Sequence, residues 1–93
     1  MPDVTVGPFN TIAITAASGV YRLREAGGMS HPIDLLNIGP GSVFLRADLD
    51  PVVNDPNSLL LPANTGFNHL MVDGSLGLGI IATADTTISV KVR

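Results

Sequence analysis

The sequence holds 93 residues, of which 45% are apolar and only 14% charged, and its formal net charge is −3. This length has room for one hydrophobic core, and the five Lys and Arg residues are too few and too scattered to bind nucleic-acid phosphates. The absence of cysteine excludes a disulfide framework and a thiolate metal site. The first residues lack the basic and apolar regions of a signal peptide, and no run approaches the roughly 18 apolar residues of a membrane span. We therefore expect one domain that stays where it is made and contacts neither nucleic acid nor membrane.

The low charge predicts a binding partner. Globular domains usually have about 25% charged residues. A small domain has a high ratio of surface to volume, so this chain must expose many small apolar and hydroxyl groups. Contact with other copies of the chain, or with a larger assembly, would cover that surface.

The N-terminal segment, residues 1–10, contains a short predicted strand, 3–6, that is followed by Gly7 and Pro8. We expect it to be an arm that lies along a neighbouring subunit, held by main-chain hydrogen bonds to an open sheet edge. Val4 and Val6 would then give specificity, and Phe9 is a further interface candidate. Residues 11–93 are expected to form the single domain.

The whole chain is divided by Gly and Pro into short runs rich in Val, Ile, Leu and Thr. Several runs alternate apolar and polar residues with the period of a strand, and none has the 3.6-residue period of a helix over a useful length. About eight strands are predicted, with a ninth closing the chain: 3–6, 11–17, 20–25, 32–38, 42–47, 58–62, 66–72, 77–83 and 86–92. Short strands at this spacing favour an all-β sandwich, jelly-roll-like, without a substantial helix.

The connections predict how these strands are joined. Tight turns at 18–19, 39–42 and 84–85 are expected to be hairpins, and residues 47–58, with two Asp-Pro steps, are expected to be the long crossover of a Greek key. The LPANTG run at 61–66 is one residue too long for an LPxTG wall-sorting signal and is predicted to be a turn. Gly77 and Gly79 interrupt a strand, which indicates a bulge or the close approach of a backbone, and an interface is expected there.

Strand alternation also predicts which side chains face inward. The expected core is Ile12, Ile14, Val20, Leu23, Ile33, Leu35, Ile38, Val43, Leu45, Leu60, Phe67, Leu70, Val72, Ile81, Ile88, Val90 and Val92. The expected solvent-facing set is Thr11, Thr15, Arg22, Arg24, Arg46, Thr87, Ser89 and Lys91.

No residue pattern predicts catalysis or a cofactor. His31, His69 and Asp34 are candidates for acid-base chemistry, but each histidine is better explained as a structural or surface residue. A weak calcium site is conceivable at Asp48, Asp50, Asn54 and Asp55, because calcium takes carboxylate and amide oxygens, although the order of an EF-hand is missing. We expect no enzyme activity.

Three segments, LLNIGPGSVFLRAD, SLLLPANTGF and LGLGIIATADTTISVKVR, together form one pattern of turns and strands. An Asn-x-Gly turn precedes a Val-x-Leu strand, a Leu-Pro turn precedes the next strand, and a strand pair closes the chain. This pattern, over residues 33–93, resembles the small all-β virion proteins of tailed bacteriophages, especially capsid decoration (cement) proteins.

The resemblance implies a homo-oligomer, with a trimer favoured, that is made in the host cytoplasm and sits on the capsid surface of the virion. Its partner would be the major capsid protein, and its work would be to stiffen the shell. A head-tail, tail or fibre component is the nearest alternative within that class. The other alternative is a small module that binds glycan or a host surface, but aromatic residues, at 4% of the chain, are too scarce for the usual stacking platform.

Overall fold

The structure is a computed structural model that describes residues 3–7, 9–25, 32–46, 50–54, 56–71 and 77–92. The chain is all-β, as predicted, and the only helical element of the described residues is a single 3-10 turn, η1. The nine strands lie close to their predicted ranges: β1 (Asp3–Val6), β2 (Phe9–Ile14), β3 (Val20–Glu25), β4 (Ile33–Pro40), β5 (Val43–Arg46), β6 (Leu59–Leu61), β7 (Thr65–Leu70), β8 (Leu78–Ala82) and β9 (Thr86–Val92); η1 spans Ala16–Ser18.

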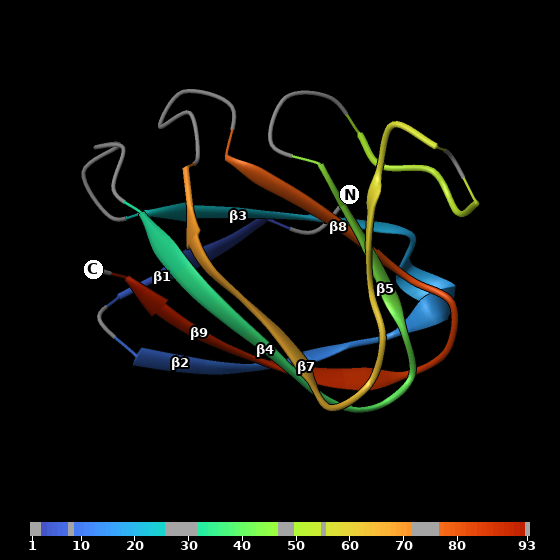
Figure 1. Cartoon of the computed structure of the whole chain (residues 1–93), viewed down its shortest axis with the longest axis horizontal. Helices are drawn as coiled ribbons and strands as arrows, with labels where there is room; N and C mark the ends of the chain where they lie inside the picture. Colours follow the sequence, from blue (N-terminus) through green and yellow to red (C-terminus); the bar gives the residue numbers. More distant parts are fainter. Residues whose placement is uncertain are drawn as a thin grey trace.

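The strands form two sheets that pack face to face, with β3 and β8 in the upper part of the view and β2 and β9 in the lower part (Figure 1). One sheet has the order β1-β3-β8-β5-β6 and the other has the order β2-β9-β4-β7. Antiparallel pairs join β2 to β9, β3 to β8, β4 to β7 and β5 to β6. The eight strands β2 to β9 are therefore one long two-stranded ribbon rolled into a sandwich, which is the jelly-roll arrangement.

β1 is added to this jelly roll as a ninth strand. It pairs in parallel with β3, from Asp3 opposite Arg22 to Val6 opposite Glu25, and forms one edge of the five-stranded sheet. Within the single chain, the segment predicted to be an arm thus contributes a strand to its own sheet, and its last two residues, Phe9 and Asn10, begin β2. An arm that reaches a neighbouring subunit stays a prediction.

The three predicted hairpins are wrong. β2 and β3, β4 and β5, and β8 and β9 are consecutive strands that lie in different sheets, so the tight turns between them are corners of the sandwich. The same Gly and Pro chemistry makes both kinds of turn: Gly19 and Gly39 adopt φ values of 73° and 98°. Two corners touch, because a Cβ at Gly41 would lie 2.3 Å from the carbonyl oxygen of Ala84.

The predicted long crossover is wrong as well. β5 and β6 pair directly, Phe44 opposite Leu60, so the chain between them closes a wide hairpin at the tip of the rolled ribbon. The LPANTG run does form the predicted turn between β6 and β7. Asn64 there has a φ of 63°, and the amide of Thr65 donates to the carbonyl of Pro62 at 3.3 Å.

The core lies between the two sheets and is only partly the one expected. Predicted core residues that are buried are Ile14, Leu23, Ile33, Leu35, Val43, Leu45, Ile88 and Val90. Ile38, Leu60 and Phe67 are instead 47%, 48% and 37% exposed, while unexpected core residues are Val6, Tyr21, Phe44, Leu61, Leu78 and Ile80. A one-residue error in the phase of a strand moves every side chain to the other face, which accounts for Leu60 and Leu61 in β6.

Candidate functional site

The predicted interface residues of the N-terminal segment lie in two different environments. Val6 is 3% exposed and belongs to the core, with Val4 packed beside it. Phe9 is 74% exposed, and the ammonium nitrogen of Lys91 lies 5.6 Å from the centre of its ring. β1 therefore turns one side of its short strand inward, whereas β2 presents an aromatic ring to the exterior.

Gly77, just before β8, and Gly79, within it, have a role within the chain. A Cβ at Gly77 would lie 2.5 Å from the carbonyl oxygen of Leu23, so the close backbone approach that was predicted is made by β3 of the same chain. Gly79 stands between Arg22 on β3 and Arg46 on β5 in the strand register. An intermolecular contact at these glycines stays a prediction.

Arg22 was expected on a solvated strand face, and that prediction is wrong. Its side chain is buried, with 6% of the residue exposed. Its guanidinium forms an ion pair with the carboxylate of Asp50 and donates to the carbonyl of Gly77 at 3.3 Å. The pair compensates the charge of the buried Arg22 side chain. It also holds Asp50, in the connection between β5 and β6, against β3.

This pairing bears on the calcium candidates. Asp48 and Asp55 lie outside the described residues, Asn54 is exposed at a φ of 63°, and Asp50 is bound to Arg22. A cation at Asp50 would compete with the guanidinium. In the described part of the chain, no three His, Cys, Asp or Glu side chains come together as a metal site would require.

The acid-base candidates are only partly described. His31 lies outside the described residues. His69 is exposed at a bulge of β7 with a φ of 58°, and its main-chain amide donates to Oδ1 of Asp34 at 3.0 Å. The contact that joins these two residues is therefore made by the backbone of His69.

The outer face of the four-stranded sheet gathers a large set of uncharged side chains. Alternation along the strands turns Ile14, Leu35 and Ile88 inward and their neighbours outward. We call this surface the sheet face; its residues are Phe9, Thr11, Ala13, Asp34, Leu36, Ile38, Gly66, Thr87, Ser89 and Lys91. Leu36 and Ile38 are 46% and 47% exposed. The only charges, Asp34 and Lys91, lie opposite each other in the register of β4 and β9.

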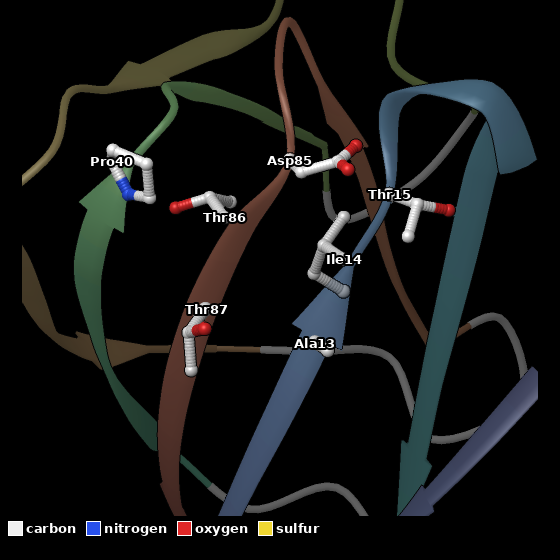
Figure 2. A pocket seen from close by; sticks show the side chains of 7 residues that line it. All are labelled: Ala13, Ile14, Thr15, Pro40, Asp85, Thr86 and Thr87. Carbon is white, nitrogen blue, oxygen red and sulfur yellow. The ribbon is translucent and has the colours of Figure 1, made fainter.

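A pocket of about 310 Å³ opens at one end of this sheet face (Figure 2). Two of its lining residues, Ile14 and Thr86, are buried, and Ala13, Thr15, Pro40, Asp85 and Thr87 complete its lining. In Figure 2, Pro40 and Thr15 stand at opposite sides, with Asp85 above the strand that carries Thr86 and Thr87. Sequence reasoning missed the pocket because its residues come from three corners that are distant along the chain.

Asp85, Thr86 and Thr15, three polar residues of the lining, are hydrogen-bonded to other parts of the fold. Oδ1 of Asp85 accepts a hydrogen bond of 3.0 Å from the amide of Ala16, and Thr86 donates to Oδ1 of Asn37 at 2.7 Å. Beside the pocket, hydrogen bonds from the hydroxyl of Ser18, then from the hydroxyl and main chain of Thr15, lower the pKa of Tyr21 below its ordinary value of 10.0.

No protein-family model matches the chain, and no curated protein or solved structure is significantly similar to it. Among the described residues, no helix is long and apolar enough to cross a membrane. The sheet face and its pocket are therefore the candidate functional site of the described residues.

Proposed function

We propose that the protein is a structural component of a tailed-phage virion, a decoration protein that binds the outer surface of the capsid and stabilises the shell. The observation that carries this proposal is the sheet face, where Leu36 and Ile38 are about half exposed among hydroxyl and small side chains. Depletion of charge at the centre of a surface is typical of protein–protein contacts.

The fold supports a mechanical role of this kind. Eight strands rolled into a sandwich give a rigid body. On the outer face of β9, Thr87 and Ser89 have short side chains with hydroxyl groups, so a partner surface can approach closely. Shape-complementary contact through such a face needs no catalytic group and no cofactor.

Several copies acting together would give the affinity. We propose a homo-oligomer, with a trimer favoured, whose subunits each contact the major capsid protein. A closed ring of identical subunits engages several sites at once, so weak single contacts combine through effective concentration. The protein would be made in the host cytoplasm and end on the capsid surface.

The test is light scattering of the purified protein followed by co-sedimentation with shells that lack it. We expect an oligomer that sediments with the shells, and we expect Leu36→Asp to weaken binding by about tenfold or more, because a buried carboxylate without a partner is costly. Val52→Asp is the matched control, since Val52 is also exposed, at 58%, but lies in the β5–β6 connection. Binding to isolated tails but not to shells would contradict the decoration role and favour a tail component.

A further inference from the structure

We infer that the pocket at the end of the sheet face receives a lysine or arginine side chain of the protein that covers this face. This inference rests on the proposed function and deepens it, because it names the chemistry that the partner surface must present. The pocket is lined by Ala13, Ile14, Thr15, Pro40, Asp85, Thr86 and Thr87.

The charge of the pocket selects its ligand. Asp85 is the only ionisable residue of the lining, and it is exposed. Its Oδ1 accepts from the amide of Ala16, but an ionised carboxylate has about four lone-pair positions and accepts further donors. A ligand that donates hydrogen bonds and carries positive charge therefore fits, and an anionic ligand is repelled.

The remaining lining suits the stem of such a side chain. Ala13, Ile14 and Pro40 offer apolar surface, and Figure 2 shows Pro40 at the opposite side of the pocket from Thr15. Lysine and arginine lay their methylene stems on apolar surface while the charged head reaches a polar group. A ligand of this type would use the apolar surface and the carboxylate together.

Two of the three threonines that line the pocket already form hydrogen bonds, which leaves the carboxylate as the main recognition element. Thr15 Oγ1 is hydrogen-bonded to the hydroxyls of Ser18 and Tyr21, at 2.6 and 3.1 Å, and Thr86 donates to Asn37. Two basic residues of the chain are engaged elsewhere, since Arg22 is bound to Asp50 and Lys91 lies over Phe9.

The position of the pocket identifies its partner. Ala13 and Thr87 belong both to the sheet face and to the pocket lining, and they are register partners on β2 and β9. A protein seated on the sheet face would therefore cover the pocket as well. The basic side chain is thus expected from the shell protein.

The first test needs no shell. We would titrate the full chain with N-acetyl-lysine amide and N-acetyl-arginine amide and follow main-chain amide signals by NMR. Binding in the millimolar range should move the signals of Ala13, Thr86 and Thr87, and Asp85→Asn should abolish the shifts. Asn can still accept from the amide of Ala16, so this variant removes the charge and keeps the hydrogen bond. Asp34→Asn, at the other end of the sheet face, is the control that should retain the shifts.

N-acetyl-glutamate amide is the probe of opposite charge and should leave the signals unmoved. Shifts that are equal for the acidic and basic probes, or that persist in Asp85→Asn, would overturn the inference. Asp85→Glu, which keeps the charge, should retain measurable binding of the basic probes.

The second test uses shells and separates this inference from the proposed function. Asp85→Asn should weaken co-sedimentation by about tenfold, the effect of one charge-assisted hydrogen bond. Val52→Lys, which makes the same change in net charge at an exposed position outside the sheet face, should change it less than about twofold. If the wild type binds shells and Asp85→Asn binds equally well, the pocket inference is wrong and the proposed function stands. If the wild type does not bind shells, the proposed function fails, and the NMR titration still decides the chemistry of the pocket.

Discussion

Asn37 is the side chain on which the corner between β4 and β5 depends. It is fully buried, and its amide nitrogen donates to the carbonyls of Gly41 and Leu61 at 2.8 and 2.9 Å. Its Oδ1 accepts from the amide of Gly39 at 3.0 Å and from the hydroxyl of Thr86. One amide group thus satisfies main-chain groups of both sheets at a point where the chain leaves the strand ladder.

We expect Asn37→Asp to lower the free energy of unfolding by about 3 kcal/mol or more, since a carboxylate cannot donate to the two carbonyls and its charge would be buried. Urea denaturation at neutral pH measures the loss. Asn68→Asp makes the same change at an exposed position of β7 and should shift stability by no more than about 0.5 kcal/mol. Equal effects of the two substitutions would show that the Asn37 network contributes nothing specific.

Tyr21 gives a prediction about pH. Hydrogen bonds from Ser18 and Thr15 lower its pKa in the folded state, so the folded protein releases the phenolic proton at a lower pH than the unfolded chain does. The unfolded state then binds more protons in the interval up to pH 10.0, and stability rises with pH there. This contribution is fully present above the ordinary pKa and is lost as pH falls through the lowered pKa.

The difference in unfolding free energy between the wild type and Tyr21→Phe should therefore grow as pH rises from neutral toward 10.0. Urea denaturation at several pH values measures this difference. The titration of Lys and of the terminal amine contributes equally to both proteins and therefore cancels in the difference. A difference that stays constant or shrinks would contradict the assigned direction of the pKa change.

At the scale of elements, the Arg22–Asp50 pair joins strand β3 to the connection at the tip of the ribbon. Asp50→Ala should cost about 1–3 kcal/mol, because it leaves a buried guanidinium without its counter-charge. The double variant Asp50→Ala with Arg22→Met should be more stable than Asp50→Ala alone, since the uncompensated charge is removed. Denaturation of the two single variants and the double variant measures the coupling; simple addition of the two losses would mean that the residues act independently.

We expect the jelly roll to tolerate the loss of β1. It pairs on one side only, with β3, and its main contribution to the core is Val6. Deletion of residues 1–7 should cost about 2–3 kcal/mol, the burial of one to two aliphatic side chains, and leave the sandwich folded. Circular dichroism and urea denaturation measure both outcomes. A truncated chain that unfolds would make β1 an obligatory part of the core.

Strand positions were predictable because their signals are local: Gly and Pro punctuate the chain, and β-branched residues fill the runs between them. The phase within a strand was predictable only where apolar and polar residues alternate, as in β9. The triple Leu of β6 and the Gly77-x-Gly79 run at β8 do not alternate, which is why Leu61, Leu78 and Ile80 were missed as core residues.

The layer to which each strand belongs was not predictable, because the same tight turns make a hairpin or a corner. The choice depends on distant pairing, such as β2 with β9 and β3 with β8. The candidate site has the same origin. Phe9 was predicted only as an interface candidate, which stays a prediction, and its ring is exposed. The sheet face and the Asp85 pocket arise only when β2, β4 and β9 come together.

At the scale of the whole molecule, low charge determines how association should respond to salt. The chain has 14% charged residues and a net charge of −3, and the two charges of the sheet face are opposite each other within it. A contact made through this face neutralises few ions, so few counterions are released on binding and screening has little to act on.

We therefore expect the dissociation constant for shells to change by less than about tenfold between roughly 0.05 M and 0.5 M salt, the dependence of about one ion pair. Co-sedimentation at four salt concentrations gives the slope. The single ion pair is the one proposed at Asp85, so the slope should fall toward zero in Asp85→Asn and remain in Val52→Lys, which changes the net charge equally but outside the sheet face. A steep slope in the wild type would mean that binding depends on many charges, which the sheet face does not contain, and the contact would then have to lie on another surface of the molecule.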